Sequence, residues 1–387
     1  MNCSIDRAAP LLGNRTLIKE RLLSALSEHY PAKSTDTIFL AGSVAEGYAN
    51  ATSDVDLFVV SDAPADGQFW QIPSLSFEIA DTYCDVEFVP RETMSSLLDR
   101  LRIWADSEAR ISEALRFVHR EWYVLHRLKT AVFLQNPVDA KELKLLARNL
   151  QIYKLSHSIN WVMRYHVDIL GLISRRDWVS ARFMAQSLVA SIFDGVLALH
   201  GDTSNSPKWR IRRLRELDAA WFEILPAFHS GKSAEQAFAD LYFADRISES
   251  KQVLEYAHRV IAMSRKFVAA GHMFLASQTV SRPPAHRKTG APPPKSLLSL
   301  DTQVHVVDGK TCLVKLGSQK KKLELSPELT LLALMFDDQT DTEAMHAWIR
   351  QIINADPVEF TEEFQNLLKS EDLLTDVTHY AHNPINH

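Results

Sequence analysis

The sequence predicts an α+β fold in which a small mixed sheet, a set of helices and a compact C-terminal module follow one another along 387 residues. Short β-branched and aromatic runs at residues 37–41, 55–60 and 83–89 are typical of strands. From residue 95 to 276 the apolar residues recur with a helical period. A proline-rich stretch at 277–296 then separates a last segment with hairpin and helix signals.

The N-terminal part combines helical and strand patterns. A helical pattern at residues 14–30 precedes the three strand-like runs, and together they predict an α/β core at residues 1–95. In the last of these runs Asp85 and Glu87 share one face, and the apolar face is expected to pack on the first helix or on the helical region.

The central part, residues 96–276, predicts a bundle of five or six amphipathic helices. One of the clearest runs from Ala181 to His200 with a single apolar stripe, and Gly201 is expected to end it. Residues 277–296 hold five of the sixteen prolines and predict an extended linker.

The C-terminal part, residues 297–387, predicts a winged-helix-like module. Asp308-Gly309 lies between two strand-like runs and is a strong hairpin signal. The expected strands are Gln303–Val307, Thr311–Leu316 and Lys321–Leu325, and the expected helices are 327–336, 342–354 and 358–370.

Composition limits the possible partners. With 43 basic and 48 acidic residues the formal net charge is −5, which argues against a chain whose main task is to coat nucleic acid or an anionic membrane. No apolar run approaches the ~18 residues of a membrane span, and the three cysteines are too few for a disulfide scaffold. We expect a cytoplasmic protein without a membrane partner and without nucleic acid as its main partner.

One segment carries the chemistry. Gly42-Ser43 is followed after ten residues by Asp54-Val55-Asp56. Side chains two apart on a strand project from the same face, so the two carboxylates can grip one or two divalent cations. Gly42 allows a phosphate to approach the backbone closely. Ser43 is expected to be the N-cap of a short helix from Val44, where its hydroxyl and free amides would meet a triphosphate.

A third carboxylate comes from the strand at residues 83–89. Asp85 or Glu87 could bridge a metal ion or take the proton from an attacking hydroxyl. Phosphoryl transfer with two metal ions needs such a group, because one cation activates the nucleophile while the other neutralises the departing pyrophosphate.

These elements resemble the DNA polymerase beta-type nucleotidyltransferase superfamily, especially its antibiotic and small-molecule nucleotidyltransferases, over residues 37–90. The resemblance implies a nucleoside triphosphate as co-substrate and Mg²⁺ as cofactor. It assigns phosphate contacts to Gly42 and Ser43, metal binding to Asp54, Asp56 and Asp85, and the catalytic third carboxylate to Asp85, with Glu87 as the alternative.

Two further resemblances are looser. Many small-molecule nucleotidyltransferases have a helix that ends in a short loop followed by Lys-Trp, as Lys208-Trp209 does here, which implies that Lys208 reaches the triphosphate. Residues 302–374 resemble PqqD-like modules, which bind a leader peptide as an added strand. The supporting residues are Leu325-Ser326-Pro327, Leu331 to Leu334, Thr342-Glu343-Ala344 and Leu367 to Leu374, and a similar winged shape occurs in unrelated proteins.

The sequence therefore favours an enzyme that transfers a nucleoside monophosphate to a ribosomally made peptide or peptide natural product. One alternative acceptor is an aminoglycoside-like antibiotic, a polycation that would need an acidic pocket from Glu113, Glu121 or Asp168. Another alternative is a protein-modifying nucleotidyltransferase or toxin–antitoxin regulator.

Each motif also has a purely structural interpretation. Ser43 and Glu46 could form a helix capping box. The aspartate pair and Lys208 could be solvated surface, and the spacing of Arg120 and His126, found in some helical ribonuclease domains, arises easily by chance.

Overall fold

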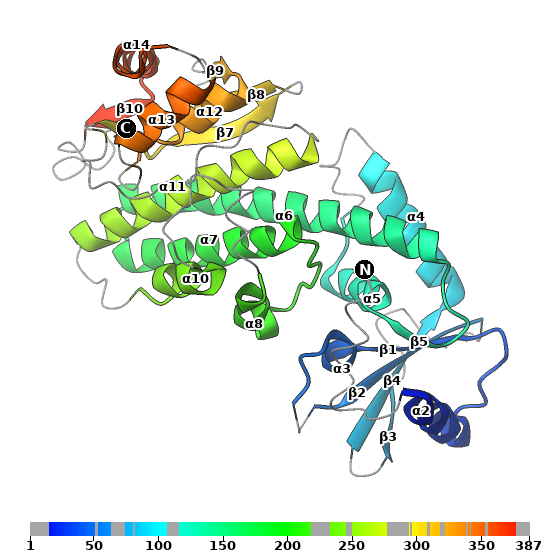
Figure 1. The fold of residues 1–387 in the computed structure, drawn as a ribbon. Coiled ribbons are helices and arrows are strands. Elements are labelled where there is room, and N and C mark those ends of the chain that lie inside the picture. Colours follow the sequence, from blue (N-terminus) through cyan, green and yellow to red (C-terminus); the bar gives the residue numbers. More distant parts are fainter. Residues whose placement is uncertain are drawn as a thin grey trace. The chain divides into compact units, whose positions relative to one another are not determined.

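The structure is a computed structural model, and it divides the chain into two compact units. Unit 1 comprises Met1–Tyr153 and Thr203–Trp209, and unit 2 comprises Lys154–Asp202 and Arg210–His387 (Figure 1). The mixed sheet, the many helices and the small C-terminal strands confirm the predicted α+β fold. The structure describes residues 15–50, 53–62, 74–79, 82–106, 116–217, 233–244, 250–276, 294, 296–307, 310–317, 322–337, 340, 342–352 and 355–376.

Unit 1 is built on a five-stranded mixed sheet in the order β3-β4-β2-β1-β5. Its strands are β1 (Thr37–Ala41), β2 (Val55–Ser61), β3 (Ser74–Ile79), β4 (Thr82–Pro90) and β5 (Val132–Gln135). Strands β2 and β4 run parallel, and the other pairs are antiparallel. The sequence predicted β1, β2 and β4. It missed β3, and it missed β5 because that strand lies inside the stretch expected to be helical.

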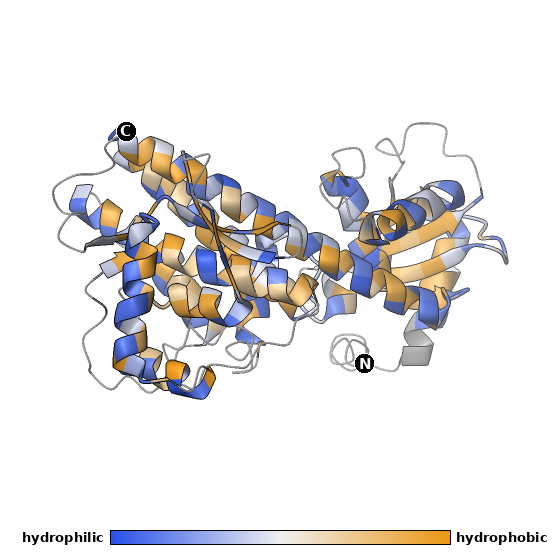
Figure 2. Ribbon diagram, turned by 90° about the horizontal axis from the view of Figure 1, so that it is seen from above, coloured by the Kyte–Doolittle hydropathy of each residue, from blue (hydrophilic) through white to orange (hydrophobic). Residues whose placement is uncertain are grey.

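Different helices cover the two faces of this sheet. Alternate residues of β2 face opposite sides of the sheet. Leu57 and Val59 pack with α2 (Arg15–His29). Phe58 and Val60 pack with α4 (Arg91–Asp106) and α5 (His119–Lys129). Cys84 and Val86 of β4 lie on the α2 side, as predicted. Figure 2 shows hydrophobic residues along these strands. The face under α5 is the one that carries the acidic residues.

Unit 2 contains long helices and the C-terminal module. The helices are α7 (Trp178–Leu199), α8 (Arg210–Arg215), α10 (Ala234–Tyr242), α11 (Ser250–Leu275) and part of α6 (Ala140–Ser174). The predicted helix at 181–200 corresponds to α7, which Asp177 caps at its start and Gly201, with a φ of +84°, follows at its end. Among the described residues α7 is long and apolar enough to span a membrane, but 56% of that stretch is buried in the protein interior.

The C-terminal part contains the three strands and three helices predicted from the sequence. They are β7 (Thr302–Val307), β8 (Lys310–Lys315), β9 (Lys322–Leu325), α12 (Pro327–Ala333), α13 (Thr342–Ile352) and α14 (Pro357–Ser370). A two-stranded sheet of β6 (Ser296–Leu298) and β10 (Leu374–Asp376) was not predicted. The turn Asp308-Gly309 and nearly all of the expected linker, 277–296, lie outside the described residues.

A single hydrophobic cluster runs through unit 2. It joins Phe193 of α7 and Phe267 of α11 to Val304, Leu332 and Trp348 of the C-terminal strands and helices. The C-terminal strands and helices therefore share a core with the helices before them. The domain boundaries proposed from the sequence remain predictions.

Candidate active site

Three strand ends meet where the acidic residues lie. Asp56 is in register with Ala41 of β1 on one side and with Asp85 of β4 on the other. Because β1 runs antiparallel to β2 and β4 runs parallel to it, the end of β1 and the starts of β2 and β4 lie at one edge of the sheet. The fold thus brings together Gly42, Asp54, Asp56 and Asp85, as the sequence predicted.

The carboxylates occupy the polar end of the face covered by α5. Asp56 projects to the same side as Phe58, which packs under α4 and α5. The side chains of Asp56 and Glu87 are each 17% exposed, whereas Asp54 is exposed. At its apolar end this face packs against α5. At its polar end the carboxylates remain partly exposed to solvent.

Gly42 is in direct contact with the Asp56 carboxylate. Its φ is +73°, and a Cβ placed on it would lie 1.7 Å from Oδ2 of Asp56. A side chain at this position would displace the carboxylate and would also strain the backbone. The sequence predicted that a phosphate would approach the backbone at Gly42 closely. In the structure the Asp56 carboxylate makes this close approach.

The helix after this turn, α3 (Gly42–Glu46), begins earlier than predicted. It starts at Gly42 with Ala41 as the N-cap, and no side chain caps it. The prediction that Ser43 is an N-cap is wrong, because the left-handed Gly42 already turns the chain into the helix. The carbonyl of Ser43 instead accepts the amides of Tyr48 and Ala49.

The pKa of Asp56 is raised to about 6. Burial is the largest cause, Arg127 opposes it, and the negative charges of Asp54, Glu87 and Asp85 raise it further. Removing water from a carboxylate and crowding it with like charges both disfavour ionisation. A cation held among these groups would relieve that repulsion.

One face of α5 places three side chains over the acids. Arg120 forms an ion pair with Glu87, and the Tyr123 hydroxyl donates to Glu87 Oε1 at 3.3 Å. Arg127 Nη2 lies 3.8 Å from Asp56 Oδ2. Both guanidinium groups lie over the Tyr123 ring, at 5.1 and 4.6 Å from its centre. Sequence reasoning missed Tyr123 and Arg127. Their spacing of four residues places them on one helix face, but nothing in the sequence says which surface that face covers.

The two candidates for the third carboxylate have different surroundings. Asp85 is next to Asp56 in the parallel register and accepts a hydrogen bond from Ser76 Oγ at 2.5 Å. Glu87 is one pleat further along and is held by Arg120 and Tyr123. The geometry therefore places Asp85 nearer to the paired aspartates along the sheet.

Lys208 comes to this unit on a separate segment, Thr203–Trp209, which we call the strap. The strap belongs to unit 1, although the residues before and after it belong to unit 2. Trp209 stacks on Tyr48, just beyond α3, with ring centres 6.0 Å apart. Lys208 is exposed, and its ammonium lies 5.2 Å from the Trp209 ring centre. Lys208 thus lies next to Trp209, which contacts Tyr48 just beyond α3.

The residues fit a divalent cation by chemistry, although no three His, Cys, Asp or Glu side chains of the described residues are already closed around a metal position. Carboxylate oxygens are the ligands that Mg²⁺ prefers. The negative charges of Asp54, Glu87 and Asp85 contribute to the raised pKa of Asp56, and a cation bound among these carboxylates would offset that repulsion.

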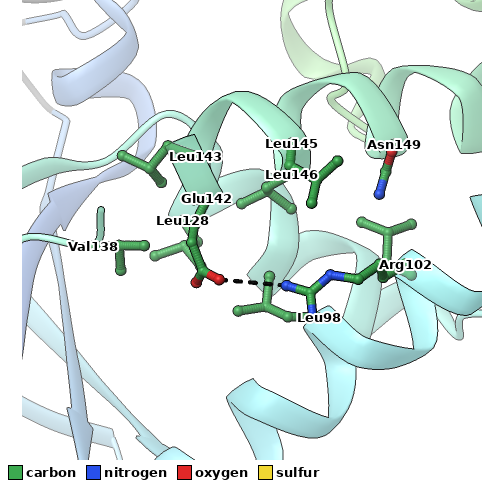
Figure 3. A pocket seen from close by; sticks show the side chains of 10 residues that line it. Leu98, Arg102, Leu128, Val138, Glu142, Leu143, Leu145, Leu146 and Asn149 are labelled. Atoms are coloured by element: carbon green, nitrogen blue, oxygen red, sulfur yellow. Dashed lines mark hydrogen bonds and ion pairs between the residues drawn. The ribbon is translucent and has the colours of Figure 1, made fainter. Parts of the chain in front are cut away.

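A small pocket between α4, α5 and the start of α6 is distinct from this site (Figure 3). Leu98, Leu128 and Leu146 are among its apolar lining residues, and an ion pair between Arg102 and Glu142 at 3.4 Å crosses it. None of the candidate site residues lines it. We assign it no part in the chemistry.

Residues 19–171 match a protein-family model described as a nucleotidyltransferase domain. No curated protein matches the chain. Among solved structures that match is the crystal structure of a nucleotidyltransferase-like protein from Exiguobacterium sibiricum. It is 12% identical, with 65% of this chain and 78% of that chain covered, and the TM-score is 0.32. A likeness at that TM-score carries no argument about the site.

The matched stretch contains the whole sheet, α3 and α5, and with them every candidate carboxylate. The chain is therefore a transferase enzyme. More particularly, residues 19–171 form a nucleotidyltransferase domain, whose general reaction moves a nucleoside monophosphate from a nucleoside triphosphate to an acceptor. The predicted resemblance to the polymerase beta-type superfamily is confirmed for this domain.

Proposed function

We propose that this enzyme transfers a nucleoside monophosphate from a nucleoside triphosphate to an acceptor hydroxyl, with Mg²⁺ as cofactor and pyrophosphate as the second product. The acceptor oxygen bonds to the α-phosphorus, the bond from that phosphorus to the pyrophosphate oxygen breaks, and the hydroxyl proton passes to a carboxylate. The observation that supports this most strongly is the register of Asp56 with Ala41 and Asp85, together with the close approach of Gly42 to the Asp56 carboxylate.

Each candidate residue has a stated role in this proposal, and Asp85 has two. Asp54, Asp56 and Asp85 would hold Mg²⁺, which when bound neutralises phosphate charge and aligns the reacting groups. The backbone at Gly42 and Ser43 binds phosphate oxygens, and Lys208 adds a mobile positive charge. Arg127 keeps part of the negative charge of Asp56 balanced before the substrate arrives.

For the catalytic third carboxylate we propose Asp85 rather than Glu87. Arg120 and Tyr123 both engage the Glu87 carboxylate, whereas Asp85 lies next to Asp56 in the parallel register. We expect Asp85→Asn to lower kcat at least a hundredfold. Glu87→Gln keeps the size of the side chain and should lower kcat by no more than about tenfold. The opposite order of the two variants would assign the role to Glu87.

The acceptor we propose is a ribosomally made peptide or a peptide natural product in the cytoplasm. The support is the three-stranded antiparallel sheet β7-β8-β9, in which β9 is an edge strand that could accept an added strand. The buried free thiols of Cys84 and Cys312 suit a reducing compartment.

An aminoglycoside-like acceptor has less support, because Glu121 already pairs with Arg100 at 2.6 Å and caps α5 through the Val118 amide at 3.0 Å. Of the other two acids suggested for an acidic pocket, Glu113 lies outside the described residues and Asp168 is on α6 in unit 2.

The proposal is tested by incubating the full chain with each of the four labelled triphosphates, Mg²⁺ and a panel of peptides and aminoglycosides, followed by mass spectrometry. We expect one acceptor to gain the mass of one nucleoside monophosphate, and the double variant Asp54→Asn, Asp56→Asn to abolish the gain. Transfer of a bare phosphate, or undiminished transfer by the double variant, would refute the proposal. The panel also decides between peptide and aminoglycoside.

A further inference from the structure

The strap is fixed to α5 at one end and to Tyr48, just beyond α3, at the other. Trp122 Nε1 donates to the Thr203 carbonyl at 2.9 Å, and Asn205 Nδ2 donates to the His119 carbonyl at 3.1 Å. At its other end Trp209 stacks on Tyr48. The position of Lys208 therefore depends on how α5 and α3 hold the strap.

A chain of polar side chains joins the same strap to the acidic site. Arg127 lies 3.8 Å from Asp56 through Nη2, and its Nη1 donates to Glu46 Oε1 at 3.1 Å. The other carboxylate oxygen of Glu46 lies 3.4 Å from His126 Nε2. The second ring nitrogen of His126, Nδ1, is 2.9 Å from Thr203 Oγ1. Four successive contacts thus connect a proposed metal ligand to the first residue of the strap.

Three members of this series of side-chain contacts are more buried than the acidic residues of the site. Thr203 is fully buried, and the side chains of Glu46 and His126 are 9% and 5% exposed. In such surroundings each member must keep its partner, because an unpaired buried charge or polar group is costly. Sequence reasoning connected neither Glu46 nor Thr203 to the site, and it noted His126 only for its spacing from Arg120.

We propose that Arg127, Glu46 and His126 are positioning residues that hold the strap through Thr203 and so fix the position of Lys208 on unit 1. The inference rests on the proposed function in one respect, the contact of Lys208 with the triphosphate. None of the three residues needs to touch the substrate. Their effect is transmitted through the strap and is specific to the part of the nucleotide that Lys208 reaches.

The test uses Thr203→Val, which removes the hydroxyl next to His126 and keeps the branched shape. It is combined with Lys208→Met. Thr130→Val serves as the matched control, since within the described part of the chain Thr130 Oγ1 donates to main-chain carbonyls at the end of α5 and to no side chain. Calorimetry measures binding of a non-hydrolysable triphosphate with Mg²⁺ and, separately, of the corresponding monophosphate. Glu46→Gln interrupts the same series of side-chain contacts at a second position. Thermal melting checks that each variant is folded.

We expect Thr203→Val and Lys208→Met each to weaken triphosphate binding about five- to tenfold, as expected for loss of one charge contact. Monophosphate binding should stay within about twofold, and the double variant should be no weaker than Lys208→Met alone. Additive losses in the double variant, an equal loss for the monophosphate, or no effect of Thr203→Val while Lys208→Met has one would overturn the inference. A wild-type chain that binds no triphosphate would instead refute the proposed function itself.

Discussion

Among single residues, Gly42 is the most constrained position of the site. Two separate restrictions meet there, a left-handed backbone and the lack of room for a Cβ beside Asp56. Other glycines separate the two effects: Gly201 has a φ of +84° with open space around it, and at Gly171 a Cβ would meet nothing within 4 Å.

We predict that Gly42→Ala abolishes transfer and destabilises the fold by about 2 kcal/mol or more, because strain and steric conflict add. Gly201→Ala should cost about 1 kcal/mol from strain alone. Gly171→Ala, within helix α6, should be neutral or stabilising by up to about 1 kcal/mol. Urea unfolding and nucleotide transfer measure the series. A Gly42→Ala variant as active and stable as Gly171→Ala would contradict the packing described here.

The raised pKa of Asp56 predicts how stability depends on pH. Between its ordinary value of 3.8 and the folded value of about 6, the folded state binds more protons than the unfolded state. Stability therefore falls as pH rises through this window and stays lower above it. Asp56→Asn cannot ionise. In metal-free buffer at pH 8 it should exceed the wild type by roughly 2–3 kcal/mol, while the two should nearly agree at pH 4.

Thermal melting at the two pH values checks this prediction, with the exposed Asp168→Asn as the control for loss of one charge. A variant that is less stable than the wild type at pH 8 would mean that Asp56 is not under electrostatic strain.

At the scale of elements, the sequence predicted the strands of the site better than the helix above them. The aspartates two apart and the later acidic strand carry their own periodicity, so β2 and β4 could be recognised and their acids placed on one face. Which residues of α5 lie over the acids depends on how that helix packs across the sheet. No local sequence pattern indicates that Tyr123 and Arg127 do so. Strand β3 was missed although its six residues alternate between polar and apolar side chains, and β5 was missed because it lies inside a stretch interpreted as helical.

Helix α11 holds the start of the C-terminal module by a buried arginine. Arg265 donates to the carbonyls of Thr302 at 2.7 Å, Leu298 at 3.4 Å and Ser299. Replacing it by Met leaves three carbonyls without this donor, so we predict a loss of about 3 kcal/mol in unfolding free energy. The exposed Arg259→Met on the same helix should lose less than about 0.5 kcal/mol. Equal urea midpoints for the two variants would show that the arginine does not hold the module.

At the scale of the whole molecule, the C-terminal module is part of the unit 2 core. Leu300, Val304 and Trp348 belong to the same hydrophobic cluster as Phe267 of α11. We predict that a chain ending at residue 296 exposes this surface and aggregates or binds a hydrophobic dye, whereas the full chain does neither. Size-exclusion chromatography distinguishes the two outcomes. A monomeric, unchanged 1–296 chain would show that the module is separable.

We propose above all that the carboxylates beside Gly42 bind divalent cations that contact the triphosphate of the nucleotide substrate. The most direct test is electron paramagnetic resonance of Mn²⁺ titrated into the full chain with and without a non-hydrolysable nucleoside triphosphate. We expect the triphosphate to strengthen Mn²⁺ binding and Asp56→Asn to remove the bound signal, while Glu142→Gln at the separate pocket leaves it intact. Equal Mn²⁺ binding by the wild type and Asp56→Asn would contradict the account.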